Sequence, residues 1–129
     1  MTNETENIAE LTFPPDPASV AAARRFAVAA VDDLDSPTES ALVLLVSELA
    51  TNAILHARTP FTVRVMANDG TIRVEVVDGN PRLPRRKRFG PGAVTGRGLL
   101  IVDKEARRWS AERVGGGKKV WFELAGESA

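Results

Sequence analysis

The sequence contains no cysteine and only one histidine, His56. Disulfides, thiolate nucleophiles and thiolate zinc sites all need cysteine, so these three kinds of site are excluded. A single histidine also excludes a metal site built from several imidazoles. Because cysteine-free chains suit a reducing compartment, we expect a cytoplasmic protein.

Net charge is absent as well, since 17 Lys and Arg balance 17 Asp and Glu in 129 residues. A neutral chain has no overall field to hold a nucleic acid backbone or an anionic bilayer, so we expect neither partner. The longest nearly uncharged stretch, residues 41–55, is interrupted by Glu48 and is too short to cross a membrane. The start of the chain, with Glu4 and Glu6, lacks the basic residues of a signal peptide. The sequence therefore predicts a protein that is neither exported nor embedded in a membrane.

Hydrophobic periodicity predicts one domain over residues 11–125, preceded by a disordered N-terminus at residues 1–10. In chain order we expect a strand at 11–13, helices at 17–34 and 36–57, strands at 61–67 and 72–77, a loop at 79–95, a short helix at 96–103, and strands at 108–114 and 119–124. Asp16 and Ser36 are the expected N-caps of the two long helices. Trp109 and Trp121 fall in the last two strands, where we expect core packing. This order predicts an α+β two-layer sandwich, with helices on one face of a mixed, mainly antiparallel sheet.

Glu48 and Asn52 stand in the middle of a helix that is apolar on almost every side. Four residues apart, they share one helix face, and an unpaired carboxylate buried there would be strongly destabilising. We therefore expect a polar cleft opposite them. An amide oxygen is a hard ligand that suits Mg²⁺, and a neighbouring carboxylate can accept a proton from a nucleophile. A solvent-exposed helix edge, or a pair between Glu48 and an arginine, would also explain these residues.

Asp78 ends the second strand of the first predicted hairpin and is followed by Gly79-Asn80-Pro81. A carboxylate at a strand end, on the rim of a cleft, can accept a hydrogen bond from an exocyclic amine such as that of adenine. Aspartate before Gly-Asn is also an ordinary turn residue, so both interpretations stay open.

Gly96, Arg97, Gly98 and Leu99 introduce the predicted short helix. Backbone N–H groups freed of side chains could converge there on an anion, and Arg97 could add a bidentate contact to phosphate. Glycines also serve tight turns, which is the alternative. His56, one turn after Asn52, could reach a phosphate or be a satisfied, partly buried histidine.

The loop at 79–95 is too long for an idle connection in a small domain, which is typical of a functional loop or lid. It carries five cations: Arg82, Arg85, Arg86, Lys87 and Arg88. Such a cluster is usually a solvated face, although a contact to phosphates or to an acidic partner is the alternative. With one interleaved aromatic residue, Phe89, it is a weak footprint for nucleic acid.

Three short motifs follow one another along the chain. They are Glu48-Leu-Ala-Thr-Asn52-Ala-Ile-Leu-His56-Ala, Val77-Asp78-Gly-Asn-Pro81 and Gly96-Arg-Gly98-Leu99-Leu100. In this order they resemble the N, G1 and G2 boxes of the GHKL ATPase superfamily. Within it, the chain is similar to the small bacterial branch related to anti-sigma-factor serine/threonine kinases. The likeness extends from about Leu11 to Leu124.

The resemblance implies the Bergerat fold, with an ATP site between helices and sheet that a lid closes. It implies transfer of the ATP γ-phosphoryl to a serine or threonine of an anti-anti-sigma partner, binding of a sigma factor, and a homodimer. By resemblance the site residues are Glu48 as general base, Asn52 as Mg²⁺ ligand, Asp78 as acceptor of the adenine amine, and Gly96, Arg97, Gly98 and Leu99 as phosphate loop.

The chain departs from the family pattern at three places. The G1 box commonly reads Asp-x-Gly-x-Gly, and here it reads Asp78-Gly79-Asn80-Pro81-Arg82. The lid is short and basic. Many relatives carry a threonine before the Val-Trp-Phe strand, and Lys119 stands there instead, which removes a hydroxyl contact to the adenine region. Two functions stay open: an ATP- and Mg²⁺-dependent protein kinase, and a non-catalytic binding module in which a nucleotide tunes a protein interface.

Overall fold

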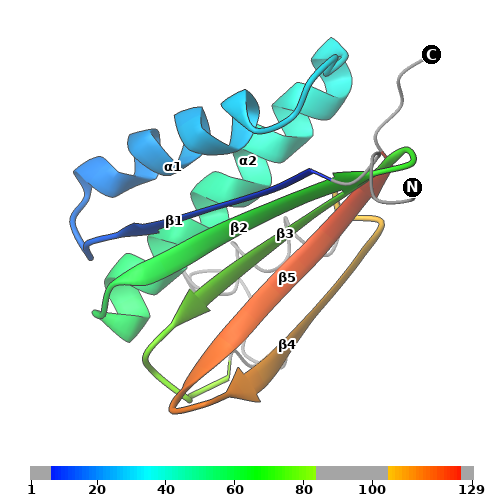
Figure 1. Ribbon diagram of the computed structural model, residues 1–129. Helices are drawn as coiled ribbons and strands as arrows, with labels where there is room; N and C mark the ends of the chain where they lie inside the picture. Colours follow the sequence, from blue (N-terminus) through cyan, green and yellow to red (C-terminus); the bar gives the residue numbers. More distant parts are fainter. Residues whose placement is uncertain (1–6, 84–104, 126–129) are drawn as a thin grey trace, which may run out of the picture.

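A five-stranded sheet carries two helices on one of its faces (Figure 1). The computed structural model describes residues 7–83 and 105–125. Its elements are β1 (Asn7–Phe13), α1 (Ala18–Ala29), α2 (Ser36–Asn52), the π-helical turn η2 (Ala53–Ala57), β2 (Phe61–Asn68), β3 (Thr71–Asp78), β4 (Arg108–Val114) and β5 (Gly117–Ala125). The strand order is β1-β2-β3-β5-β4. The predicted two-layer α+β fold is confirmed, but every pair among the described strands is antiparallel, so this part of the sheet is not mixed.

Strand β1 begins at Asn7, ahead of the expected Leu11. Residues 7–10, which were expected to be disordered, pair with the far half of β2, from Asn7 opposite Ala67 to Glu10 opposite Arg64. The long neighbouring strand offers a full set of backbone partners, and these override the polar character of the segment.

Tight turns close both predicted hairpins. Asp69 and Gly70 join β2 to β3 with φ of 47° and 78°, the pair of positive values that a type I′ turn needs. Gly115, with φ of 55°, begins the turn between β4 and β5. The sequence-based hairpins are therefore confirmed, with strand ends shifted by one or two residues.

The cap of α2 lies one residue earlier than expected. Asp35, not Ser36, is the N-cap, and its side chain accepts a hydrogen bond of 3.2 Å from the Thr38 N–H. Asp35 has the extended backbone that a cap requires, and Pro37 falls in the first turn, where a missing N–H costs nothing. The first helix is shorter than predicted and ends at Ala29. Pro17, not Asp16, is its N-cap, and the Asp16 side chain accepts a hydrogen bond of 3.0 Å from the Ala18 N–H.

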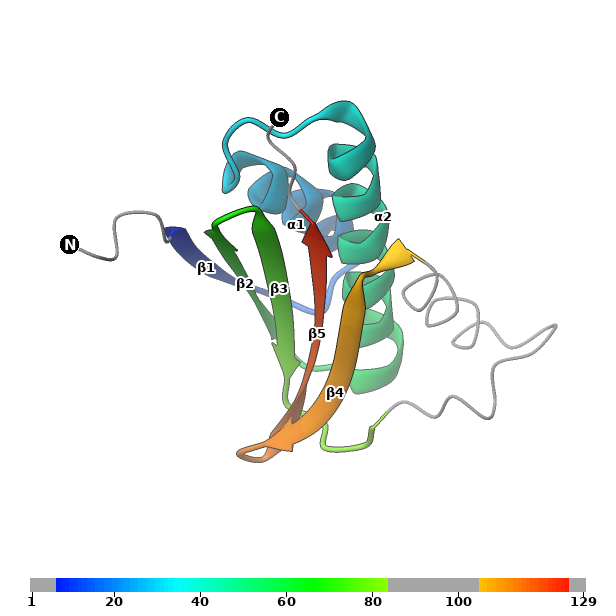
Figure 2. The ribbon, with the colours of Figure 1, turned by 90° about the vertical axis from the view of Figure 1, so that its right-hand side faces the viewer.

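Helices α1 and α2 lie side by side on one face of the sheet, with α1 over β1 and β2 and α2 over β3 and β5 (Figure 2). The buried face of α2 packs on the helix-facing residues of the sheet; the largest fully buried side chains are Phe61, Phe122, Leu42, Leu45, Val46, Val63, Val65 and Val74. By length and composition alone the helical segment Ser36–Ala57 could cross a membrane, contrary to the expectation drawn from the shorter stretch 41–55. Core helices of folded domains pass the same test, and this one supplies core residues.

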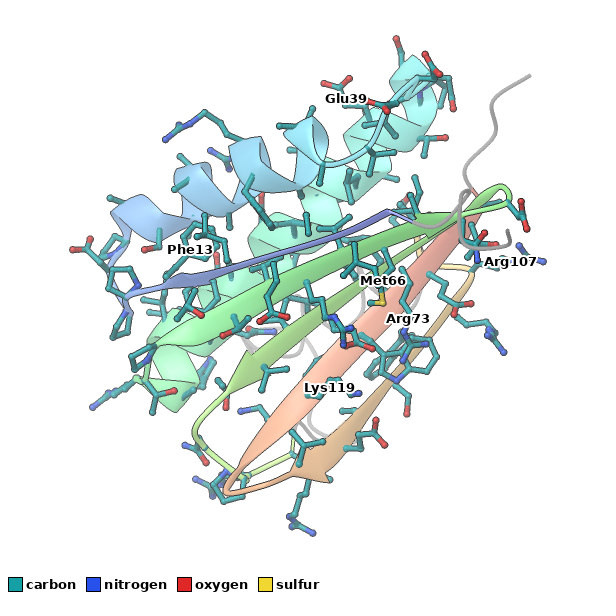
Figure 3. The ribbon with its side chains drawn as sticks, viewed as in Figure 1. Phe13, Glu39, Met66, Arg73, Arg107 and Lys119 are labelled. Carbon is teal, nitrogen blue, oxygen red and sulfur yellow. The ribbon has the colours of Figure 1, made fainter. Side chains whose placement is uncertain are left out.

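The other face of the sheet is open and polar. Arg73 and Lys119 lie on it, away from the helices, whereas Phe13 points toward them (Figure 3). Trp121 also lies on this face, with the Arg73 guanidinium carbon 3.9 Å from its ring centroid. The expectation that Trp121 packs in the core was therefore wrong. Trp109, in contrast, packs against the core.

Candidate functional site

Glu48 and Asn52 are partly buried on α2. Within residues 7–83 and 105–125, neither side chain has a hydrogen-bond or ion-pair partner, so no described arginine pairs with Glu48. Burial raises the pKa of the Glu48 carboxyl above its usual value, because the charged form loses hydration without gaining a partner. The two residues thus present uncompensated oxygen atoms on one helix face.

The helix changes character immediately after Asn52. Ala53–Ala57 form a π-helical turn, closed by a hydrogen bond of 2.9 Å from the Arg58 N–H to the Ala53 carbonyl oxygen. Arg58 then adopts φ of 58°, which ends the helix. Isolated π-turns occur often at functional sites. The predicted end of the helix at Ala57 is confirmed.

The π-helical turn contacts the loop that follows β3. The His56 carbonyl oxygen accepts a hydrogen bond of 3.4 Å from Asn80 Nδ2, and Thr59 Oγ1 accepts one of 2.8 Å from the Gly79 N–H. The pKa of His56 is lowered by burial and, to a lesser extent, by the positive charges of Lys118 and Arg58. The end of the polar helix face and the G1-like segment are therefore neighbours.

Asp78 is buried, with 7% of its surface exposed, at the last position of β3. Its Oδ1 accepts a hydrogen bond of 2.8 Å from the Asn80 N–H, and Asn80 Oδ1 in turn accepts one of 2.9 Å from the Arg82 N–H. These local bonds hold the carboxylate in one orientation. The strand alternation places Asp78 on the helix-facing side, with Val74 and Val76.

Lys118, a residue that the sequence analysis did not name, pairs with Asp78. Its Nζ lies 2.9 Å from Asp78 Oδ2 and 3.1 Å from Oδ1, and it donates to the Asn80 carbonyl oxygen at 3.2 Å. Only 11% of the Lys118 side chain and 4% of the Asp78 side chain are exposed. The described structure therefore has a nearly buried ion pair where a lone acceptor was expected.

Gly117 allows this close approach. A Cβ atom at this position would lie 1.8 Å from the Asp78 carbonyl oxygen, so no other residue fits without moving the backbone. Alternation could have found Lys118, because Val120, Phe122 and Leu124 face the core and residue 118 shares their side of β5.

Lys119 points the opposite way. Its Nζ lies 3.6 Å from Glu75 Oε2 and 3.5 Å from Glu112 Oε2, on the open face of the sheet (Figure 3). The expectation that Lys119 replaces a hydroxyl near the adenine region was therefore wrong for this residue. The cation that faces Asp78 is its neighbour, Lys118.

Gly96, Arg97, Gly98 and Leu99 lie outside the described residues, as do residues 84–95 of the expected lid. Arg82 is the one member of the basic cluster that the structure describes, and its side chain is exposed. Of the expected site residues, Asp78 is connected, through the loop at 79–82, to the π-helical turn that follows α2. Glu48 and Asn52 lie farther back along that helix.

Comparisons with known proteins bear on the family and the fold. The family described as "histidine kinase-like ATPase domain" matches residues 13–124. The uncharacterized protein SCO4941 of Streptomyces coelicolor is 41% identical over 87 residues, which cover 63% of this chain and 82% of the relative.

A crystal structure of the RsbU and RsbW domains of Rv1364c from Mycobacterium tuberculosis superposes with a TM-score of 0.69 over 90% of this chain. At 16% identity this likeness shows the fold, and this chain spans 31% of the crystallised one.

Proposed function

The chain belongs to the histidine kinase-like ATPase family, and from this membership we propose that it binds ATP with Mg²⁺ and phosphorylates a serine or threonine of an anti-anti-sigma protein. One observation carries the proposal. Glu48 and Asn52, without a partner among the described residues, lie on the helix whose end contacts the Asp78 loop. The fold shared with a chain that contains an RsbW domain supports the same choice of partner.

The described residues fit a magnesium nucleotide. Within them, no group of three or more acidic or histidine side chains could hold a metal ion alone. Mg²⁺ bound by one or two protein oxygens together with phosphate oxygens needs no such group, and Asn52 Oδ1 supplies a hard ligand. Glu48 adds a partly buried carboxylate that has no charged partner among the described residues.

In this proposal Glu48 is the general base. It would take the proton of the serine or threonine hydroxyl as that oxygen bonds to the γ-phosphorus and the bond to the ADP oxygen breaks. A raised pKa brings the carboxyl closer to neutral pH, which strengthens it as a base. Bound ATP supplies the phosphoryl group, and Asp78 orients the base of the nucleotide. Positioning and electrostatics provide most of the rate in such transfers.

A second candidate is a non-catalytic module whose protein interface is tuned by a nucleotide. The specific observation that favours it is the Lys118–Asp78 ion pair, because a neutralised acceptor departs from the family pattern. In both cases we propose a cytoplasmic protein that binds a sigma factor and forms a homodimer, as the resemblance implies.

The test compares the wild-type chain with Glu48→Gln, and with Glu39→Gln as an exposed control on the same helix. Each is mixed with γ-labelled ATP, Mg²⁺ and an anti-anti-sigma domain, and transferred label is counted. We expect Glu48→Gln to lose about 10²- to 10⁴-fold of the transfer rate while it still binds ATP.

Equal transfer by wild type and Glu48→Gln would contradict the catalytic role. ATP binding without any transfer by the wild type selects the non-catalytic module. At an ATP concentration a hundredfold above its dissociation constant, binding should stabilise the fold by about 2.7 kcal/mol. No thermal shift with ATP would sink both candidates.

A further inference from the structure

Asp78 and Lys118 together place a hydrogen-bond acceptor and a hydrogen-bond donor side by side. Both belong to the helix-facing side of the sheet, at the end where Asn80 meets the π-helical turn. The pair is held from three directions: the Asn80 N–H binds Asp78, the Asn80 carbonyl oxygen binds Lys118, and Gly117 packs against the Asp78 backbone. A pair fixed in this way can serve as a template for a ligand.

The hydrogen-bonding capacity of the pair is not exhausted within the described residues. The Lys118 ammonium carries three protons, and Asp78 and the Asn80 carbonyl oxygen are its acceptors. Asp78 Oδ1 accepts hydrogen bonds from the Asn80 N–H and from Lys118, whereas Oδ2 contacts Lys118 Nζ through the ion pair, at 2.9 Å. One N–H donor and one carboxylate lone pair therefore remain, on atoms that lie 2.9 Å apart.

We propose that Lys118 is a base-reading residue of the ATP site, where its Nζ donates to adenine N1 while Asp78 Oδ2 accepts from the exocyclic amine. A neighbouring donor and acceptor are what a carboxamide offers when it binds adenine. In the Asp78–Lys118 pair, the carboxylate is the acceptor and the ammonium is the donor, so both groups are charged. The inference rests on the proposed ATP binding and adds to it a contact that the family-like acceptor, Asp78, does not make.

The arrangement also sets base selectivity. Guanine presents the reverse order, with an acceptor on the exocyclic atom and a donor on N1. Because the Asn80 N–H fixes the Asp78 carboxylate, guanine would place its exocyclic oxygen against a carboxylate oxygen. We therefore expect ATP to bind more tightly than GTP.

The experiment measures calorimetric binding of ATP, GTP and 1-deaza-ATP, in which a C–H group replaces N1, to the full chain with Mg²⁺. We expect the wild type to bind 1-deaza-ATP about 10- to 100-fold more weakly than ATP, the value of a good bidentate base contact. Lys118→Met should weaken ATP binding by a similar factor and bind the two adenine nucleotides equally. Lys119→Met removes the same charge one residue later on the opposite face, and should keep the wild-type pattern.

Two results would overturn the inference while leaving ATP binding intact. One is equal affinity of the wild type for ATP and 1-deaza-ATP. The other is tighter ATP binding by Lys118→Met, which would make the ammonium a competitor of the base. Absence of ATP binding by the wild type overturns the proposed function as well, so the two failures are distinguishable.

If circular dichroism shows that Lys118→Met does not fold, ¹⁵N-labelled ATP bound to the wild type decides. A hydrogen bond from the ammonium moves the N1 resonance upfield of free ATP, and an unmoved resonance refutes the contact.

Discussion

Two consecutive lysines of β5 pair with carboxylates on opposite faces of the same sheet. Lys118 and Asp78 pair at 2.9 Å on the helix-facing side, with side chains 11% and 4% exposed. Lys119 lies 3.6 Å from Glu75, whose carboxylate also meets Arg73 at 3.0 Å and Arg64 at 3.8 Å. Among the described residues, Asp78 pairs with one cation and Glu75 with three.

This difference separates two uses of charge. A network on an open face tolerates the loss of one member, because water and the other cations compensate. A single pair at the end of a core has no substitute, so removal of one partner leaves a buried charge. Such a site is therefore less robust to substitution than the network on the open face.

The largest effect on stability is expected where Gly117 packs against the Asp78 backbone. Gly117→Ala places a methyl group on the Asp78 backbone, whereas Gly116→Ala, one residue away, meets nothing within 4 Å. We expect Gly117→Ala to lower the free energy of unfolding by about 3 kcal/mol or more, and Gly116→Ala to change it by less than about 0.5 kcal/mol. Urea unfolding measures both; similar values for the two variants would refute the close packing at Gly117.

The next effect compares the lysines directly. Lys118→Met should cost about 2 kcal/mol of unfolding free energy, below the value for a fully buried pair because Lys118 keeps some exposure. Lys119→Met should cost less than about 1 kcal/mol, since Arg73 and Arg64 remain beside Glu75. If denaturant titrations gave the same loss of unfolding free energy for both variants, the two lysines would not differ as proposed.

A smaller effect on stability is expected from the Thr59 hydroxyl, which binds the loop that follows β3. Thr59→Val removes the acceptor of the Gly79 N–H and should cost about 1 kcal/mol. Its control is Thr12→Val on the open face, which breaks the exposed bond of 2.7 Å between the Thr12 and Thr62 hydroxyls and should cost about 0.5 kcal/mol or less. Thermal unfolding ranks the two, and a larger loss for Thr12→Val would reverse the expected order.

The smallest effect concerns the pH dependence of stability, where Glu48 on α2 and Glu123 on the open face of the sheet should differ in sign. The pKa of Glu48 is raised by burial, so its ionisation is unfavourable in the fold, and the penalty grows as pH rises from the usual glutamate value through the raised one. Glu48→Gln should therefore be more stable than wild type at pH 7, with no advantage below about pH 4.

Glu123 on the open face provides the opposite case. Burial alone would raise the pKa of Glu123, but hydrogen bonds and charges from Arg108 and Arg73 bring it below its usual value. Its contribution to stability is present above the usual glutamate pKa and is lost as pH falls through the lowered one. Glu123→Gln should be less stable than wild type at pH 7, and the deficit should vanish in acid. Parallel pH profiles of the two variants would contradict these assignments.

Local patterns were sufficient for the helices and strands that the structure describes and for their order, whereas the expected short helix at 96–103 lies outside the described residues. The alternation of β2 and β3 around Asp69-Gly70 and the apolar periodicity of α2 both predicted what the structure shows. Helix ends were less predictable, because Asp35 and Ser36 are both good caps and the local backbone decides between them.

Contacts between distant segments were beyond such patterns. Asp78 was identified as an acceptor, but its partner lies 40 residues away and depends on the register between β3 and β5. The same register decides that Lys119 and Trp121 face outward, and a shift of one residue would exchange them with Lys118 and Val120. Alternation along β5 places Lys118 on the core side, but its pairing with Asp78 depends on the register of the sheet.

The β2–β3 turn at Asp69 and Gly70 offers a practical consequence of the hairpin geometry. Strand β3 runs for eight residues from this turn to Asp78, about 25 Å at the usual rise per residue. Asp69 and Gly70 are exposed, and their conformation is set locally. A fluorescent reporter attached at Asp69 would therefore stand clear of any occupant beside Asp78, and its signal would follow unfolding in the presence of nucleotide without itself obstructing binding.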